Sequence, residues 1–254
     1  AHHAPAITRV LNDRDVRVQD NAGNTPLHAV CLGGSTAFTE VAGEFRDRYD
    51  DIRLRQNLIQ CAMMLLEAGA EPCLRSDDGA TTLSEAVGLH HSEVLKLLLE
   101  FGGAEVVNAT GTGAAGWTVL AQAAKSGHVD CCSYLLAAGA DVNLRVINDS
   151  LNLSPLQLAM RDLRQNPNYS WSRENRNKRR VYALLVANGA TIPPDGFDAD
   201  DAYLCKVRAA GGFPAYEKAH RMRLTATCAR VVFPRLPVDA VSHVVAFAFH
   251  TGYY

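Results

Sequence analysis

Residues 116–143 read GWTVLAQAAKSGHVDCCSYLLAAGADVN, and this stretch decides the fold. It opens on a glycine turn with a Thr-x-Leu start at Thr118, passes through an alanine-rich segment and then a leucine-rich segment, and closes on Gly-Ala. The closing Gly139 stands where the end of a helix needs a residue that tolerates positive φ. The stretch therefore predicts a pair of short helices.

The same pattern occurs four times along the chain. Thr25 and Ser154 can cap a helix through their hydroxyls, and Pro26 and Pro155 then occupy the first helical position. A single helix pair cannot bury its apolar face, so we expect the pairs to stack, and at least three are needed for stability. The four copies start at Thr25-Pro26-Leu27, Thr81-Thr82-Leu83, Thr118-Val119-Leu120 and Ser154-Pro155-Leu156, and they end at Gly69-Ala70, Gly102, Gly139-Ala140 and Gly189-Ala190.

These copies resemble the ankyrin repeat, a unit of about 33 residues with the signature Thr-Pro-Leu-His-x-Ala. Residues 25–28 read Thr-Pro-Leu-His. The resemblance covers residues 15–193 and implies an all-α fold, an ankyrin-repeat solenoid of helix pairs with hairpin-like turns. We expect a segment 1–14 before the repeats and a helical extension over 194–254 after them.

Two insertions interrupt the predicted repeats. The first two inward leucines, Leu27 and Leu83, are 56 residues apart, whereas the following steps are 37 and 36 residues, so extra residues fall at about 36–56. The last two Gly-Ala endings are 50 residues apart, which places further extra residues at 162–178. Both insertions fall between the two helices of a repeat. The first mixes acidic and basic residues and predicts an added amphipathic helix at the edge of the stack.

The resemblance implies that a partner protein contacts the hairpin tips and the exposed face of the first helix of each repeat. Trp117 occupies a turn position that normally faces solvent, so it is either an interface anchor or packed against the neighbouring turn. Carried over position by position, the candidate partner contacts are Asn21, Ala22, Asn24, Leu32, Asp77, Asp78, Ala80, Leu89, Ala115, Trp117, Lys125, Ser126, Ser150, Leu151, Leu153, Arg161 and Asp162.

The second insertion is strongly basic. Residues 164–180 carry six basic residues and one acidic residue, a local charge of +5, together with two aromatic residues. This composition predicts a loop that either docks on an acidic protein surface or contacts RNA. The candidate cations are Arg164, Arg173, Arg176, Lys178, Arg179 and Arg180.

The tail after the repeats predicts three further helical stretches: 198–210, Pro214 to about Arg230, and one that follows Pro237. Residues 224–232 resemble the Leu-xxx-Cys-xxx-aliphatic box by which ankyrin proteins with a SOCS box bind elongin, and residues 236–247 resemble the opening of an F-box. Either resemblance implies a substrate adaptor of a cullin-type ubiquitin ligase. The alternatives are a helical cap that seals the last repeat and another docking element. The candidate docking residues are Leu224, Cys228, Val232, Leu236, Pro237, Val241, Val244, Val245 and Phe249, and the expected apolar stripe of the last helix also includes Ala248.

Nothing in the sequence predicts chemistry. The sequence has no nucleophile elbow, P-loop, HExxH or GxGxxG pattern. His28 and His128 occupy repeat positions where histidine bonds neighbouring backbone, and neither His90-His91 nor Cys131-Cys132 has the spacing of metal ligands. We therefore expect no enzyme activity, no cofactor and no metal.

The composition bounds the compartment and the partners. The seven cysteines contain no CxxC pair and fit a reducing, intracellular compartment. No run of eighteen apolar residues occurs and the start lacks a signal-peptide pattern, so we expect no membrane span. The net charge of -2 gives no global attraction to nucleic acid. We expect a non-enzymatic scaffold that binds protein partners, as a subunit of a larger complex or as a ligase adaptor, with RNA contact through 164–180 as the weaker alternative.

Overall fold

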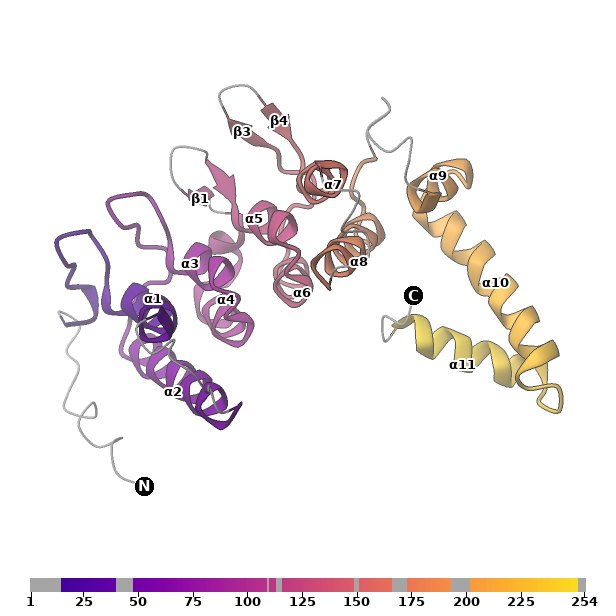
Figure 1. The fold of residues 1–254 in the computed structure, drawn as a ribbon, viewed down its shortest axis with the longest axis horizontal. Helices are drawn as coiled ribbons and strands as arrows, with labels where there is room; N and C mark the ends of the chain where they lie inside the picture. Colours follow the sequence, from indigo (N-terminus) through magenta and orange to yellow (C-terminus); the bar gives the residue numbers. More distant parts are fainter. Residues whose placement is uncertain are drawn as a thin grey trace. The chain divides into compact units, whose positions relative to one another are not determined.

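The chain divides into two compact units, Ala1–Thr191 and Ile192–Tyr254. The first contains helices α1 to α8 and two short β-hairpins, and the second contains α9 to α11 (Figure 1). This structure is a computed structural model, and it describes residues 15–39, 48–108, 110–112, 116–148, 151–165, 173–192 and 202–250.

The first unit is a stack of helix pairs. Figure 1 shows the first helices of the pairs, α1, α3, α5 and α7, side by side in one row, and the second helices, α2, α4, α6 and α8, in a parallel row. Each helix packs on its partner and on the next helix of its own row. This arrangement confirms the all-α repeat solenoid expected from the sequence. The pairs are α1 (Pro26–Thr39) with α2 (Arg48–Glu67), α3 (Thr82–Gly88) with α4 (Ser92–Val107), α5 (Val119–Ser126) with α6 (Val129–Ala137), and α7 (Pro155–Gln165) with α8 (Arg173–Ala187).

Turns and short hairpins precede the first-row helices. Before α1 the chain forms a short 3-10 helix, η2 (Asp15–Arg17), and before α3 a single bridge joins Arg75 to Thr81. Antiparallel hairpins β1–β2 and β3–β4 lead into α5 and α7, respectively. Their strands are β1 (Thr110–Thr112), β2 (Trp117–Thr118), β3 (Val146–Asn148) and β4 (Leu151–Leu153).

Each first-row helix begins at a hydroxyl cap. The hydroxyl of Thr118 accepts the N–H of Ala121 at 3.1 Å, and the hydroxyl of Ser154 accepts the N–H of Gln157 at 3.3 Å. In the first, second and fourth repeats, the side chain three positions after the cap also accepts a hydrogen bond from the backbone N–H of the cap residue. Gln157 Oε1 accepts the N–H of Ser154 at 2.9 Å, Ser84 Oγ accepts the N–H of Thr81, and His28 Nδ1 accepts the N–H of Thr25. These reciprocal bonds satisfy backbone groups that a helix end leaves unpaired. The expected caps at Thr25 and Ser154 are thus confirmed.

Histidines and turn residues join neighbouring repeats. His28 Nε2 lies 3.3 Å from the carbonyl of Ala80, and His128 Nδ1 lies 2.9 Å from the carbonyl of Val87. The N–H of Asp77 donates to the carbonyl of Ala22 at 3.0 Å. The structural role expected for His28 and His128 is confirmed, because each ring bonds the backbone of the adjacent repeat.

Helix α4 does not end where the sequence suggests. Gly102 was expected to end the second helix of its repeat, but α4 continues to Val107 and buries Val106 and Val107. A Cβ at Gly102 would lie 2.7 Å from Val106 Cγ2 and 2.9 Å from Pro72 Cγ, so the glycine is needed for close packing rather than for a positive φ. The other three endings, Gly69, Gly139 and Gly189, do adopt positive φ as predicted.

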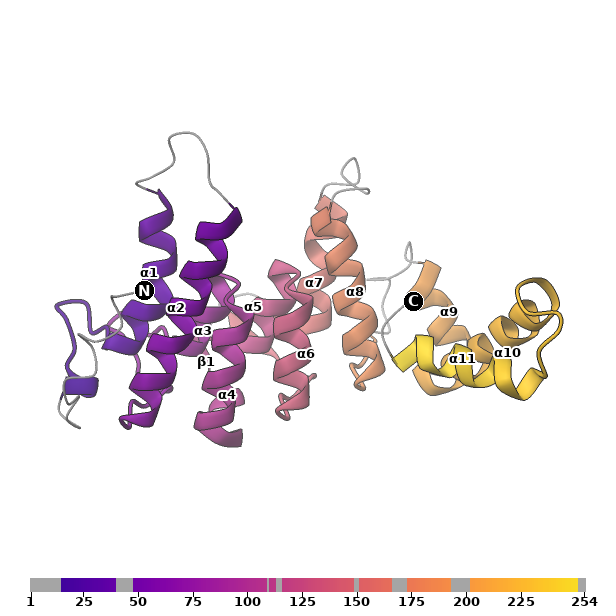
Figure 2. The ribbon, with the colours of Figure 1, turned by 90° about the horizontal axis from the view of Figure 1, so that it is seen from below.

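Both insertions lengthen the helices of their repeats. Of the amphipathic helical segment expected in the first insertion, residues 48–55 are helical and form the start of α2, while α1 extends to Thr39. In place of a loop over 162–178, α7 extends to Gln165 and α8 starts at Arg173. Residues 40–47 and 166–172 lie outside the described part of the chain. Figure 2 shows that α1 with α2 and α7 with α8 rise beyond α3 to α6 on the same side of the stack.

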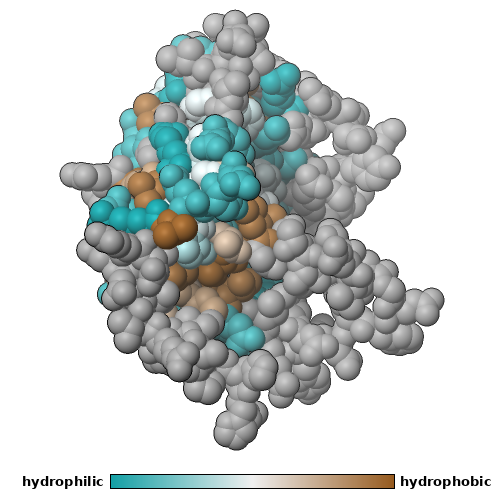
Figure 3. Space-filling view, turned by 90° about the vertical axis from the view of Figure 1, so that its left-hand side faces the viewer, coloured by the Kyte–Doolittle hydropathy of each residue, from teal (hydrophilic) through white to brown (hydrophobic). Residues whose placement is uncertain are grey.

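The core runs between the two rows, and it is less covered at the α1–α2 end. The inward leucines Leu27, Leu83, Leu120 and Leu156, each two residues after a cap, are fully buried. Val30, by contrast, is only half-buried, although the equivalent alanines of the later repeats are buried. No described helix pair covers this side of α1–α2, and Figure 3 shows apolar residues gathered at that end. The equivalent alanines are Ala86, Ala123 and Ala159.

The second unit is built around a helical hairpin. Helix α9 (Ala202–Ala209) packs on α10 (Phe213–Val231), which pairs with α11 (Val238–His250). The predicted stretch over 198–210 is thus described as helix only from Ala202, since 193–201 lie outside the described residues. The apolar stripe expected on the last helix is only partly correct. Val241 and Val245 are buried, but Val244 is 48% exposed, because it points away from α10; the side chains of Ala248 and Phe249 are outside the described set. The core residues around Val241 and Val245 are Leu224, Cys228, Ala229 and Phe233.

Candidate protein-interaction surface

The caps provide a common register for the first-row helices. Counting from each cap, the residue four positions on and the residue seven positions on lie one helical turn apart on the same face. This register defines what we call the first-row face. The fourth positions are Ala29, Glu85, Gln122 and Leu158, and the seventh positions are Leu32, Gly88, Lys125 and Arg161.

The first-row face is continuous from one repeat to the next. A Cβ at Gly88 would lie 3.1 Å from Gln122 Nε2, so the seventh position of the second repeat touches the fourth position of the third. Gly88, Lys125 and Arg161 are exposed, and Gln122 is half-buried. Because the register repeats, the side chains at these positions form one surface along the stack.

Most of the predicted partner contacts have side chains at the surface. Ala80 is the exception: it is 5% exposed, and its carbonyl accepts from Ser76 and faces His28, so its role is structural and its prediction as a contact is wrong. Ala115 and Ser150, and the side chains of Leu151 and Asp162, lie outside the described set. The exposed contacts are Asn21, Ala22, Asp77, Asp78, Lys125 and Arg161, and the half-buried ones are Asn24, Leu32, Leu89, Trp117, Ser126 and Leu153.

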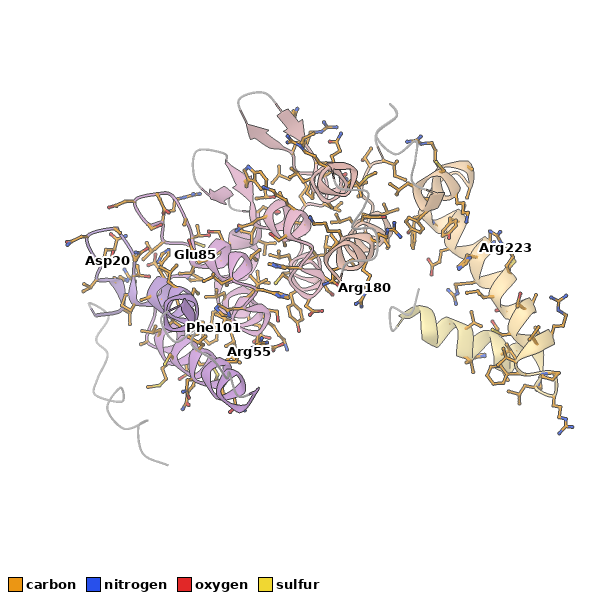
Figure 4. All side chains as sticks on the ribbon, viewed as in Figure 1. Asp20, Arg55, Glu85, Phe101, Arg180 and Arg223 are labelled. Carbon is orange, nitrogen blue, oxygen red and sulfur yellow. The ribbon has the colours of Figure 1, made fainter. Side chains whose placement is uncertain are left out.

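Two of the acidic side chains at the tips are fixed by their own turns. The carboxylate of Asp20, labelled in Figure 4, accepts the backbone N–H groups of Asn24 and Ala22, which lower its pKa. The carboxylate of Asp78 accepts the hydroxyl of Ser76 and the N–H of Ala80, and these bonds lower its pKa as well. Both residues therefore stay ionised at neutral pH while they shape the tips.

Of the two roles that the sequence left open for Trp117, the structure shows packing. Its ring is half-buried and packs against the buried pair Ala121 and Leu158, together with Leu153. On its other side, the ammonium of Lys125 lies 4.7 Å from the ring centroid. Its indole Nε1 is buried and has no hydrogen-bond partner among the described residues. Trp117 is therefore a packed residue that contacts Lys125 of the first-row face, and its role as an interface anchor stays a prediction.

The sequence-based prediction missed the fourth positions of the first-row face. Glu85 lies on α3 (Figure 4), where burial raises the pKa of its carboxyl and the nearby Asp78 adds to the effect. Gln122 has a buried Oε1 without a hydrogen-bond partner among the described residues. Leu158 is 4% exposed. These positions could have been found from the sequence, because each lies four residues after a cap residue, Thr81, Thr118 or Ser154.

The basic segment 164–180 is not a single solvated loop. Lys178 is only 4% exposed on α8, so its side chain is not at the surface and its prediction as a partner or RNA contact is wrong. Arg179 and Arg180 are exposed on α8, and Figure 4 places Arg180 in the second row. The side chains of Arg164, Arg173 and Arg176 lie outside the described set.

The predicted docking residues of the tail divide into two groups. Leu224, Cys228, Val241 and Val245 pack against one another within the second unit. Val241 and Val245 are buried and cannot contact a partner as expected, whereas Leu224 and Cys228 are half-buried and stay predictions. Val232, Leu236 and Pro237, at the turn between α10 and α11, and Val244 on α11 are exposed. The side chain of Phe249 lies outside the described set. A cleft of about 650 Å³ lies between α10 and α11 and is lined by residues that include Arg221, Met222 and Val238.

The histidines and cysteines form no recognisable site. The rings of His90 and His128 stack 4.1 Å apart, and no three His, Cys, Asp or Glu side chains of the described residues are arranged to hold a metal ion. Burial raises the pKa of the thiols of Cys31 and Cys131 to about 12, which keeps both thiols protonated. None of the described helices combines the length and the apolar character that crossing a membrane requires.

The comparison with known families agrees with the repeat geometry. No curated protein matches the chain. Residues 52–146 match the family model for ankyrin repeats, in three copies, which spans α2 to the start of β3. The fold is accordingly an ankyrin-repeat solenoid, and this chain carries repeats of a kind that generally mediates protein–protein interaction.

Proposed function

We propose that this chain is a non-enzymatic module that holds a partner protein on the first-row face and the adjoining hairpin tips. The contrast between constant and variable positions carries the proposal. The caps and the inward leucines are nearly the same in every repeat, and all are buried. The seventh positions differ in every repeat, as leucine, glycine, lysine and arginine. A constant framework with a varied surface suits recognition of one particular partner.

The proposal is tested by blocking the face without disturbing the core. Ala29 is exposed on α1 and Ser126 is half-buried at the end of α5, so the double variant A29R/S126R adds bulk and charge to the first-row face. Ser133 and Ala137 are exposed on α6, so S133R/A137R makes the same chemical change on the second row. We expect proteins that co-purify stoichiometrically with the parent chain to be lost from A29R/S126R and retained by S133R/A137R. Retention by A29R/S126R with loss from S133R/A137R would contradict the proposal.

A second candidate function is docking of the second unit on another protein, as in a complex subunit or a ligase adaptor. The observation that favours it is the exposure of Val232 and Leu236 at the α10–α11 turn, beside the cleft lined by Met222. The variant V232D/L236D removes this apolar surface and leaves the buried pair around Val241 intact. Loss of elongin or of an F-box counterpart from the purified complex would support the adaptor version. Unchanged co-purification of all partners would contradict tail docking.

A further inference from the structure

The first-row face changes character along the stack. Its only described acidic side chain is Glu85, at the fourth position of the second repeat, whereas the seventh positions of the third and fourth repeats are Lys125 and Arg161. Neither Lys125 nor Arg161 has a carboxylate partner among the described residues. Two exposed cations without a described carboxylate partner therefore lie on α5 and α7.

The two cations flank an apolar cluster. Trp117 and Leu153 lie partly exposed over the buried pair Ala121 and Leu158. Lys125 lies over the ring of Trp117, and Arg161 follows Leu158 by one helical turn on α7. We call the set formed by Trp117, Lys125, Leu153, Leu158 and Arg161 the Trp117 surface.

The cation–π contact between Lys125 and Trp117 is weak enough for a carboxylate of a partner to replace it. A cation over an aromatic ring at an exposed position contributes only a modest attraction, and a carboxylate can compete for the same ammonium. When the ammonium turns to a carboxylate, the ring is uncovered for apolar contact. Partly exposed tryptophan and arginine side chains are also the types that most often dominate binding energy.

We propose that the Trp117 surface binds a partner segment that combines acidic with aliphatic side chains, with its carboxylates on Lys125 and Arg161 and an aliphatic side chain on Trp117 and Leu153. The inference rests on the proposed function, because it names the chemistry of the partner on the same face. Adjacent packed helices lie about 10 Å apart. The two carboxylates are then about three residues apart in an extended segment, or about seven residues apart in a helix.

The experiment is a selection from a displayed library of random twelve-residue peptides on the full chain at low salt. The parent is compared with K125E/R161E and with a control, K96E/R179E, in which two exposed cations of the second row undergo the same change. We expect the parent and the control to enrich peptides that contain both Asp or Glu and aliphatic residues. The selected peptides should bind K125E/R161E about tenfold more weakly or worse, with the difference shrinking as salt rises.

Tryptophan fluorescence locates the bound peptide. The chain has two tryptophans, so the substitution W171F leaves Trp117 as the only one. Binding of a selected acidic peptide should change the emission of Trp117, because Lys125 leaves its ring. A peptide that binds without changing this emission lies elsewhere and overturns the inference. Circular dichroism of every variant checks that the helices are intact.

The outcomes separate this inference from the function on which it rests. The selection could instead enrich basic or neutral peptides that bind S133R/A137R but not A29R/S126R. This result would overturn the inference of an acidic partner but support binding on the first-row face. Equal binding of acidic peptides by the parent and K125E/R161E would overturn the inference in the same way. Peptides lost only from S133R/A137R would contradict both.

Discussion

The substitution Gly102→Ala tests the packing of α4 against two opposing effects. Alanine is favoured over glycine inside a helix by about 1 kcal/mol. The added Cβ, however, would lie 2.7 Å from Val106 Cγ2 and 2.9 Å from Pro72 Cγ. Val106 is β-branched and buried, and the proline ring is rigid, so neither can move aside easily. Overpacking of this kind costs about 1–3 kcal/mol. We expect G102A to lower the free energy of unfolding by about 1 kcal/mol net, as the clash outweighs the helical gain.

Gly88→Ala is the matched control. Gly88 ends α3 and is exposed, and an added Cβ would meet only the end of the Gln122 side chain, with Nε2 at 3.1 Å. We expect G88A to be neutral or to raise the free energy of unfolding by up to about 1 kcal/mol. Urea unfolding followed by circular dichroism at 222 nm measures both. A G102A variant as stable as the parent would show that α4 does not pack against Pro72 as described.

Three further predictions concern other parts of the stack. Burial lowers the pKa of His28 and of His128, so the unfolded chain binds more protons than the folded chain below about pH 6.5. The free energy of unfolding should therefore decrease as pH falls from 7.5 to 5.5, and a urea midpoint that stays constant would contradict this. Thr118→Ala removes the cap of α5 and should cost about 1 kcal/mol, measured by urea unfolding against Thr227→Ala, an exposed hydroxyl on α10. Replacing Arg179 and Arg180 with glutamine should weaken any RNA binding and flatten its salt dependence; filter binding that is unchanged would remove RNA contact from the functions of this chain.

The sequence predicted the features that depend on local chemistry. Hydroxyl caps at Thr25 and Ser154, inward leucines and glycine endings follow from short-range hydrogen bonding and from backbone conformation, and the structure contains them. The extension of α4 past Gly102 could not be predicted from the neighbouring sequence. It depends on the burial of Val106 and Val107 in the core, and this burial is determined by the helices that pack around them.

The surface was harder to predict for the same reason. Ala80 occupies a tip position, but it is buried, and its carbonyl accepts a hydrogen bond from Ser76 and faces the ring of His28 in the neighbouring repeat. Lys178 belongs to a strongly basic segment, yet α8 turns its stem into the stack. Lys125 and Trp117 are eight positions apart in the sequence. Their contact depends on how the hairpin leads into α5, so no sequence pattern predicts it.

Because the apolar side of α1–α2 is incompletely buried, we expect local unfolding of the stack to begin in the first repeat. In a linear array each repeat is stabilised mainly by its neighbours, so a repeat whose apolar side is less covered opens more easily. Helices α5 and α7, in contrast, pack together more extensively than any other described pair. Fluctuations that melt the first repeat would therefore leave Trp117 and its surroundings folded. Amide hydrogen exchange should show α1 and α2 exchanging well before α5, so that early opening and the proposed binding surface lie in different repeats of the array.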